Sequence, residues 1–78
     1  MSSRLPSLKP REVLRALERA GFYVHHTGPG SHVQLKHRTD PVKRVTVPGH
    51  QGFDMPRGTL HSILKQAGMT PEEFAGYL

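Results

Sequence analysis

The residues best suited to chemistry in this 78-residue chain lie in one short stretch, Gly28-Pro29-Gly30-Ser31-His32. A turn rich in glycine and proline leads into a serine and a histidine, and Val33-Gln34-Leu35-Lys36-His37-Arg38 follows at once. Histidine has an unperturbed pKa of about 6.5, so its side chain can accept and donate protons near neutral pH. The stretch therefore offers one candidate acid–base group, His32, close in sequence to basic residues.

Cleavage of an RNA backbone is a reaction that such a group could catalyse. The 2′-hydroxyl of RNA is the nucleophile, so the reaction needs removal of its proton, protonation of the departing 5′-oxygen, and stabilisation of charge on the phosphate oxygens. Lysine and arginine can supply the last of these, and no metal is required. Acid–base catalysis by one side chain contributes roughly 10²–10⁴-fold, which predicts a slow nuclease. The alternative is an exposed histidine at a strand start that has no catalytic role.

Neighbours of His32 are candidates for supporting roles. Ser31 could bind a phosphate oxygen or orient the turn, and Gly30 gives the backbone room to approach a phosphate, which the N–H groups of a turn can help to hold. For contacts with RNA phosphates we select four basic residues: Lys36, Arg38, Lys43 and Arg44. The alternative for these four is an ordinary solvated strand face.

The other histidines need the same assessment, because the chain has six histidines and no cysteine. His50, in a Pro–Gly loop, is a second acid–base candidate, whereas His37 should face the helices or lie near a strand end and His61 should be structural. The adjacent His25 and His26 would point to opposite faces of a strand. Zinc binding is a competing interpretation, but the sequence has no His-x-x-x-His pair and few carboxylates near its histidines. We expect no metal and no other cofactor.

The charge of the chain narrows the choice of partner. Eleven Lys and Arg against six Asp and Glu give a formal net charge of +5, which favours nucleic acid or an acidic protein as partner. No apolar run approaches the roughly 20 residues that span a bilayer, and no signal-peptide core is present. We expect residues 1–78 to form one soluble, cytoplasmic domain without membrane contact, with about residues 1–8 flexible.

The elements that must position these groups can be predicted from periodicity. A helix should start at Pro10, continue with apolar residues at helical spacing, and end at Gly21 as a left-handed cap. Alternation then predicts three antiparallel strands with short turns, over about residues 22–27, 32–38 and 43–47. Pro48 should stop the third strand.

The alternation in the second strand decides where His32 points. If Val33 and Leu35 face the core, period-2 geometry places the residues between them on the open face of the sheet: His32, Gln34, Lys36 and Arg38. The same reasoning puts Arg44 on the open face of the third strand. One face of the sheet should be apolar and the other basic.

Two more helices complete the prediction. Asp54 is a candidate N-cap for a helix with Pro56 in its first turn and Gly68 at its end, and its buried stripe would be Leu60, Ile63, Leu64 and Ala67. Thr70-Pro71-Glu72-Glu73 is a capping box with proline at the first position, and it starts a short C-terminal helix. Met69 and Phe74 have the spacing of a hydrophobic staple. The helices should cover the apolar face of the sheet, which makes an α+β fold.

Several short motifs occur together and in order: Gly21-Phe22, Gly30-Ser31-His32, Val45-Thr46-Val47-Pro48, Gly58-Thr59-Leu60, Ile63-Leu64-Lys65-Gln66-Ala67-Gly68 and Glu73-Phe74. Over about residues 9–74 the chain resembles the HicA (YcfA-like) family of bacterial and archaeal toxins. The resemblance implies an α-β-β-β-α fold like that of double-stranded-RNA-binding domains, ribosome-independent cleavage of mRNA, and neutralisation by a HicB-type antitoxin. It also implies that His32, the histidine of the family's Gly-Ser-His motif, is catalytic. One departure is Pro29, where the family often has a basic or polar residue.

Two other functions stay open at this point. One is a non-catalytic RNA-binding module of the same fold, and the other is a protein whose main role is to bind an acidic partner. A fold of this kind contacts RNA through its shape, 2′-hydroxyls and phosphates, so we expect weak sequence specificity and RNA affinity that falls steeply with salt. Tyr23 could stack on a base at the open face or could serve in packing.

Overall fold

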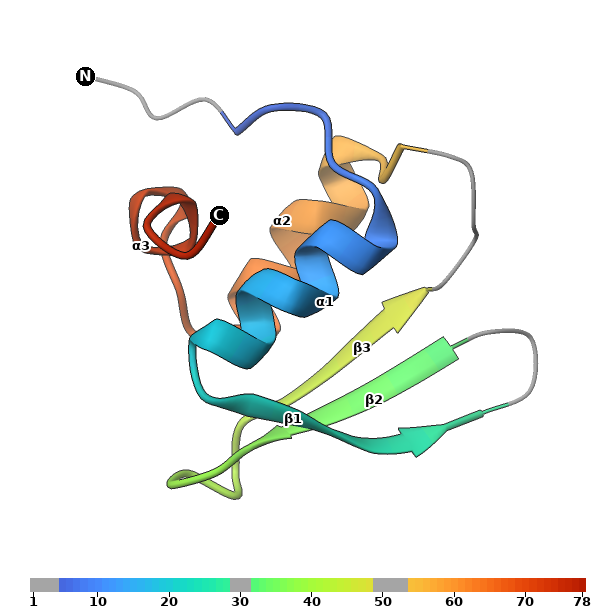
Figure 1. The fold of residues 1–78 in the computed structure, drawn as a ribbon, viewed down its shortest axis with the longest axis vertical. Coiled ribbons are helices and arrows are strands. Elements are labelled where there is room, and N and C mark those ends of the chain that lie inside the picture. The colour runs from blue at the N-terminus through green and yellow to red at the C-terminus, as the bar shows by residue number, and fades with distance from the viewer. Residues whose placement is uncertain (1–4, 29–31, 49–53) are drawn as a thin grey trace.

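The helices of this chain lie on one side of a three-stranded sheet. The computed structural model describes residues 5–28, 32–48 and 54–78. The elements follow in the order α1 (Pro10–Arg19), β1 (Phe22–Thr27), β2 (His32–His37), β3 (Arg44–Pro48), α2 (Arg57–Ala67) and α3 (Pro71–Ala75). The strands form one antiparallel sheet in the order β1-β2-β3 (Figure 1). This α+β fold, with three antiparallel strands and a short C-terminal helix, confirms the prediction.

The core lies between the sheet and the helices. Its largest fully buried side chains come from both layers and from α3: Phe22, Phe74, Leu17, Leu35, Ile63, Val13, Val45 and Val47. Full burial of a side chain of this size contributes roughly 1.5–3 kcal/mol. The predicted stripe of α2 is confirmed, because Leu60, Ile63, Leu64 and Ala67 are all buried. None of the helices in the described part of the chain is both long and apolar enough to cross a membrane.

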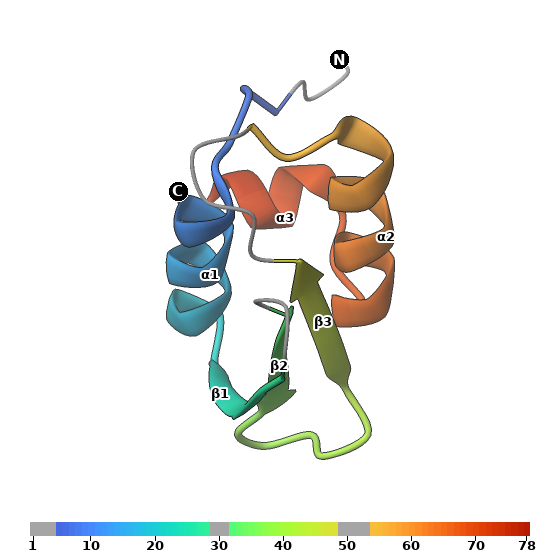
Figure 2. The same ribbon diagram turned by 90° about the vertical axis from the view of Figure 1, so that its right-hand side faces the viewer.

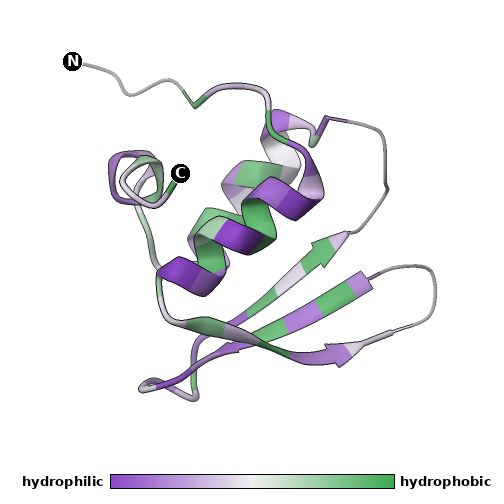
Figure 3. Cartoon of the chain, viewed as in Figure 1, coloured by the Kyte–Doolittle hydropathy of each residue, from purple (hydrophilic) through white to green (hydrophobic). Residues whose placement is uncertain are grey.

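The alternation predicted for β2 and β3 is confirmed by their register. Leu35 is buried and pairs with Val45, and Val33 pairs with Val47. The intervening pairs, which therefore share the opposite face, are His32 with Pro48, Gln34 with Thr46, and Lys36 with Arg44. Figure 3 shows polar and apolar residues alternating along these two strands. The pleat thus carries His32 to the open face.

The helix ends also agree with the prediction where capping residues were identified. Gly21, directly after the C-cap of α1, has a φ of 104°, and Gly68 at the end of α2 has a φ of 70°. Both lie in the left-handed region that favours glycine. At α3, the Thr70 side chain accepts a hydrogen bond from the Glu73 N–H at 3.1 Å, and Glu73 Oε1 accepts one from the Thr70 N–H at 2.8 Å. This is the predicted capping box.

The start of α2 differs from the prediction. The N-cap is Pro56, and the helix begins at Arg57, so Asp54 does not cap it. A helix that started after Asp54 would need Met55 in helical conformation directly before a proline, which is sterically disfavoured. Asp54 instead pairs with Lys9, with Oδ1 and Nζ 3.7 Å apart.

The N-terminal segment was expected to be flexible up to about residue 8, but its second half packs on the core. Leu5 and Leu8 are each only 4% exposed. The Met55 N–H donates a hydrogen bond to the Leu8 carbonyl at 2.6 Å. Two leucines in a polar, proline-punctuated stretch gave no periodic signal, so their burial could not be read from spacing.

Strand β1 contains an irregularity that affects its two adjacent histidines. The pairing with β2 shifts between Val24 and His26, which is the signature of a β-bulge at His25. Both His25 and His26 are exposed. Simple alternation, which would send them to opposite faces, therefore does not hold at this point of the strand.

Candidate functional site

His32 is the first residue of β2 and its side chain is exposed. On one side its carbonyl accepts a hydrogen bond from the Gly28 N–H at 2.8 Å, and on the other it pairs with Pro48, the last residue of β3. The sheet therefore holds His32 at the N-terminal end of β2, on the open face, where a molecule from solution can reach it. Gly30 and Ser31, the predicted supporting residues, lie outside the described residues.

An open cavity of about 440 Å³ lies beside His32. His32, Thr46 and Pro48 line it from the sheet, and α2 contributes Gly58, Thr59, Ser62, Ile63 and Gln66. Strand β3 is at the edge of the sheet and α2 runs alongside it, as Figure 2 shows. The cavity is thus a feature of tertiary packing, because its two walls are distant in sequence. Its volume is in the range of small-ligand sites.

Hydrogen bonds fix the α2 wall of this cavity against the edge strand. The Thr46 N–H donates to Gln66 Oε1 at 3.0 Å, and Gln66 Nε2 donates to Ser62 Oγ at 3.4 Å. The first bond satisfies a backbone donor that an edge strand would otherwise present to solvent. Ser62 and Gln66 are one helical turn apart, so both face β3.

Two of the four predicted phosphate contacts come together on the open face. Lys36 and Arg44 pair across β2 and β3, and Tyr23 of β1 pairs with Lys36 on its other side. Lys36 is half-buried and Arg44 is exposed. Lys36 lies four residues beyond His32, which is about 13 Å at 3.3 Å per residue along a strand. The pair therefore lies on the same face as His32 but farther along the strands.

Arg38 contacts the ring of Tyr23, the residue that pairs with Lys36. It follows the last residue of β2, and its guanidinium carbon lies 5.5 Å from the centroid of the Tyr23 ring, a cation–π arrangement. The Arg38 N–H donates to the Gly21 carbonyl at 2.9 Å, which fixes the backbone there. Tyr23 therefore supports an arginine at the edge of the open face.

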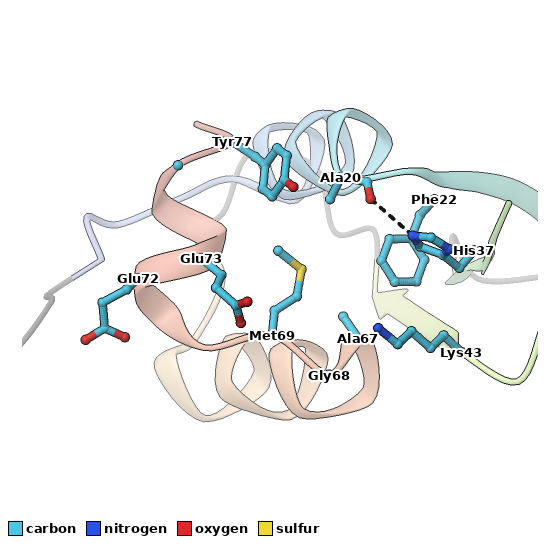
Figure 4. Close-up of a pocket in the computed structure, with 11 residues that line it drawn as sticks. Ala20, Phe22, His37, Lys43, Ala67, Gly68, Met69, Glu72, Glu73 and Tyr77 are labelled. Atoms are coloured by element: carbon cyan, nitrogen blue, oxygen red, sulfur yellow. Dashed lines mark hydrogen bonds between the residues drawn. The ribbon is translucent and has the colours of Figure 1, made fainter. Parts of the chain in front are cut away.

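Lys43, the fourth predicted phosphate contact, extends its side chain toward Gly68 at the end of α2. Strand β3 starts at Arg44, one residue later than expected, and the Lys43 side chain lines a second cavity, of about 630 Å³ (Figure 4). A Cβ atom at Gly68 would lie 3.4 Å from its Cε and 3.5 Å from its Nζ. Lys43 thus sits at the C-terminus of α2, where the helix dipole favours a cation.

His37 is held in the same region, at the end of β2, as the sequence predicted. Its Nε2 lies 3.2 Å from the Ala20 carbonyl and its Nδ1 accepts a hydrogen bond from the Thr39 N–H at 3.2 Å (Figure 4 shows the first contact). The ring packs edge-on against Phe22, with centroids 4.9 Å apart and planes at 84°. These contacts join α1, β1 and the end of β2, so His37 has a structural role.

Among the other histidines that the structure describes, His26 pairs with Gln34, and its ring lies 3.9–4.0 Å from where a Cβ atom at Gly28 would stand, so it borders the same end of the sheet as His32. His61 is exposed on α2, and His50 lies outside the described residues. Within residues 5–28, 32–48 and 54–78, no three His, Cys, Asp or Glu side chains are placed to hold a metal ion.

The polar residues of α2 that line this cavity were not among the site residues predicted from the sequence. Thr59, Ser62 and Gln66 follow one another at helical spacing and lie directly beside the buried stripe of the same helix. This spacing was a usable signal of a polar strip at the border of the core. What it could not show is that the strip would face the same cavity as a histidine of the sheet.

Comparison with protein-family models matches residues 10–69 to the model described as HicA toxin of bacterial toxin–antitoxin. The match runs from the first residue of α1 to the residue after the Gly68 cap, so it includes His32 and the whole of α2. A search of curated proteins found no match.

Proposed function

The chain belongs to the HicA toxin family of bacterial toxin–antitoxin systems, and from this premise we propose that it is a metal-independent, ribosome-independent endoribonuclease that cleaves mRNA. Membership in the family implies an antitoxin as partner. The observation that carries the proposed activity is an exposed histidine, His32, on the open face beside a cavity between the sheet and α2. Such a histidine can exchange protons with a bound backbone without a metal.

The proposed reaction uses the 2′-hydroxyl of RNA as nucleophile. His32 accepts the 2′-hydroxyl proton while the 2′-oxygen forms a bond to phosphorus. The bond from phosphorus to the 5′-oxygen then breaks, the 5′-oxygen takes a proton from water, and His32 returns its proton to the solvent. The products are a 2′,3′-cyclic phosphate and a 5′-hydroxyl end. The proposed site needs only one titrating side chain.

Binding of the RNA is assigned to Lys36, Arg38 and Arg44. Lys36 and Arg44 pair on the same face as His32 but farther along the strands, so they would hold a neighbouring phosphate and set the position of the chain. Phosphate contacts of this kind position the nucleic acid and read no sequence. Weak sequence preference follows from this arrangement.

An RNA with one nucleotide in 2′-deoxy form tests the reaction class. Purified protein is incubated with excess chelator and a short RNA, and the cleaved position is mapped. We expect cleavage that chelator does not abolish, fragments that end in 2′,3′-cyclic phosphate, and complete protection when the nucleotide 5′ to the cut is 2′-deoxy. Binding without cleavage would instead favour a non-catalytic RNA-binding module, and chelator-sensitive cleavage of the 2′-deoxy substrate would contradict the mechanism.

A HicB-type antitoxin is proposed as the neutralising partner. The exposed His32 and the basic pair Lys36 and Arg44 share one face, so an acidic partner seated there would block both together. We expect an acidic protein encoded by the neighbouring reading frame to co-purify with the toxin and to abolish its cleavage of RNA. An antitoxin that bound tightly but left cleavage unchanged would contradict this blocking mode.

A further inference from the structure

The orientation of the Gln66 side chain is fixed by the group that it binds. A backbone N–H can only donate, so the atom of Gln66 that faces the Thr46 N–H must be its oxygen, Oε1. The amide nitrogen, Nε2, therefore faces Ser62. The choice between oxygen and nitrogen, which is ambiguous for many amides, follows here from hydrogen-bonding capacity alone.

This orientation decides what Ser62 can do. A hydroxyl has one hydrogen to donate and two lone pairs that accept. Gln66 Nε2 donates to Ser62 Oγ, so one lone pair of the hydroxyl is occupied and its hydrogen is directed away from Gln66. Ser62 lines the cavity that contains His32, so it can offer a hydrogen-bond donor to a molecule bound there. Donors in such a chain polarise one another, which strengthens the terminal one.

Gly58, in the first turn of α2, is unexplained by the packing of the protein itself. A Cβ atom at this position would meet nothing within 4 Å, and the residue does not have the positive φ of Gly21 and Gly68. Glycine inside a helix is less favourable than alanine, because it loses more backbone entropy. The space over Gly58 opens into the cavity beside His32. A ligand that approaches the backbone of α2 would account for the glycine.

Resting on the proposed nuclease function, we propose that the phosphate under attack lies between His32 and α2, and that Ser62 donates a hydrogen bond to one of its non-bridging oxygens. Gln66 is a positioning residue, because it acts on the phosphate through Ser62. The described residues that line the cavity include no carboxylate, which suits an anionic group. Phosphate oxygens gain negative charge in the transition state, so a donor fixed beforehand stabilises that state more than the bound substrate.

A double-mutant cycle tests the proposal on the whole protein. The variants are Ser62→Ala, Gln66→Leu and the double variant, with Ser62→Thr as a rescue and Lys65→Ala as a matched control on exposed α2 surface. Measurements are kcat and KM for RNA cleavage and the melting temperature of each protein. Ser62→Ala should lower kcat about 10- to 100-fold with little change in KM, and Ser62→Thr should recover most of the loss.

The cycle separates positioning from stability. Gln66→Leu should lower kcat when Ser62 is present and have no further effect on kcat in the Ser62→Ala background, while it lowers the melting temperature in both. The proposal would be overturned if the losses in kcat of the two single variants multiplied in the double variant. It would also be overturned if Ser62→Ala kept the wild-type kcat. If the wild-type protein did not cleave RNA, the proposed nuclease function itself would fail. If His32→Ala cleaved RNA as fast as the wild type, the assignment of His32 would fail, and either result would remove the basis of this inference.

Gly58→Ala gives a second readout that a purely structural role would not produce. Because open space surrounds this position, the substitution should leave the melting temperature equal or higher. If the phosphate approaches the first turn of α2, the added methyl group should weaken binding of an uncleavable 2′-deoxy RNA analogue several-fold. Unchanged affinity for the analogue would contradict this approach.

Discussion

At the scale of single residues, two neighbours in sequence have different surroundings. Arg44 lies on the open face opposite Lys36, whereas Lys43 extends toward Gly68 at the end of α2. The pleat accounts for this difference, because Lys43 has the parity of the buried Val45 and Val47, whereas Arg44 has the parity of the exposed Thr46. The alternation in the sequence therefore already favoured Arg44 over Lys43 for the open face, and the structure adds that Lys43 extends toward the end of α2.

Substitutions that remove the positive charge of Arg44 or of Lys43 form a matched pair. Arg44→Gln should weaken RNA binding and make the slope of log K against log salt shallower by about 0.7, the value for one phosphate contact on a single strand. Lys43→Gln should leave that slope unchanged and lower the free energy of unfolding by about 0.3–1 kcal/mol, because it removes a cation from a helix C-terminus. Binding titrations at several salt concentrations and chemical denaturation make the comparison. Equal changes in slope would show that Lys43 also reaches RNA.

At the scale of elements, the site depends on how α2 is placed. Gln66 of α2 accepts a hydrogen bond from Thr46 of β3. The segment before α2 contacts the residues before α1 twice, by the hydrogen bond from Met55 to Leu8 and by the ion pair of Asp54 with Lys9. Local signals predicted the helix, its buried stripe and its Gly68 cap. They did not predict its start, because the preference of Asp54 for an N-cap was outweighed by the steric effect of Pro56. They could not predict which strand it would flank.

The N-terminal segment offers a test of this arrangement. Leu8→Ala should lower the free energy of unfolding by about 2–5 kcal/mol, since a buried leucine is removed from the core. Ser7→Ala, at an exposed position beside it, is the control and should change stability by less than about 0.5 kcal/mol. Denaturant unfolding followed by circular dichroism gives both values. A Leu8→Ala protein as stable as the control would mean that this segment does not pack on the core.

At the scale of the whole molecule, the two faces of the sheet in this 78-residue chain differ in their side chains. One face of the sheet is covered by helices and makes the core, and the other carries His32, Lys36 and Arg44. The period-2 pattern of β2 and β3 was enough to predict this division, because alternation in a half-buried strand leaves only one face free. The cavity beside His32 is a property of the assembled fold, since its walls come from β2, β3 and α2.

The most direct test of the account is the cleavage rate of His32→Ala in the presence of chelator. His61→Ala is the matched control, because His61 is also exposed but lies on α2. Both proteins should fold and bind RNA like the wild type. We expect His32→Ala to cleave RNA about 10²–10⁴-fold more slowly and His61→Ala to cleave at the wild-type rate. A His32→Ala protein that cleaves RNA as fast as the wild type would contradict the assignment of His32 as the catalytic acid–base group.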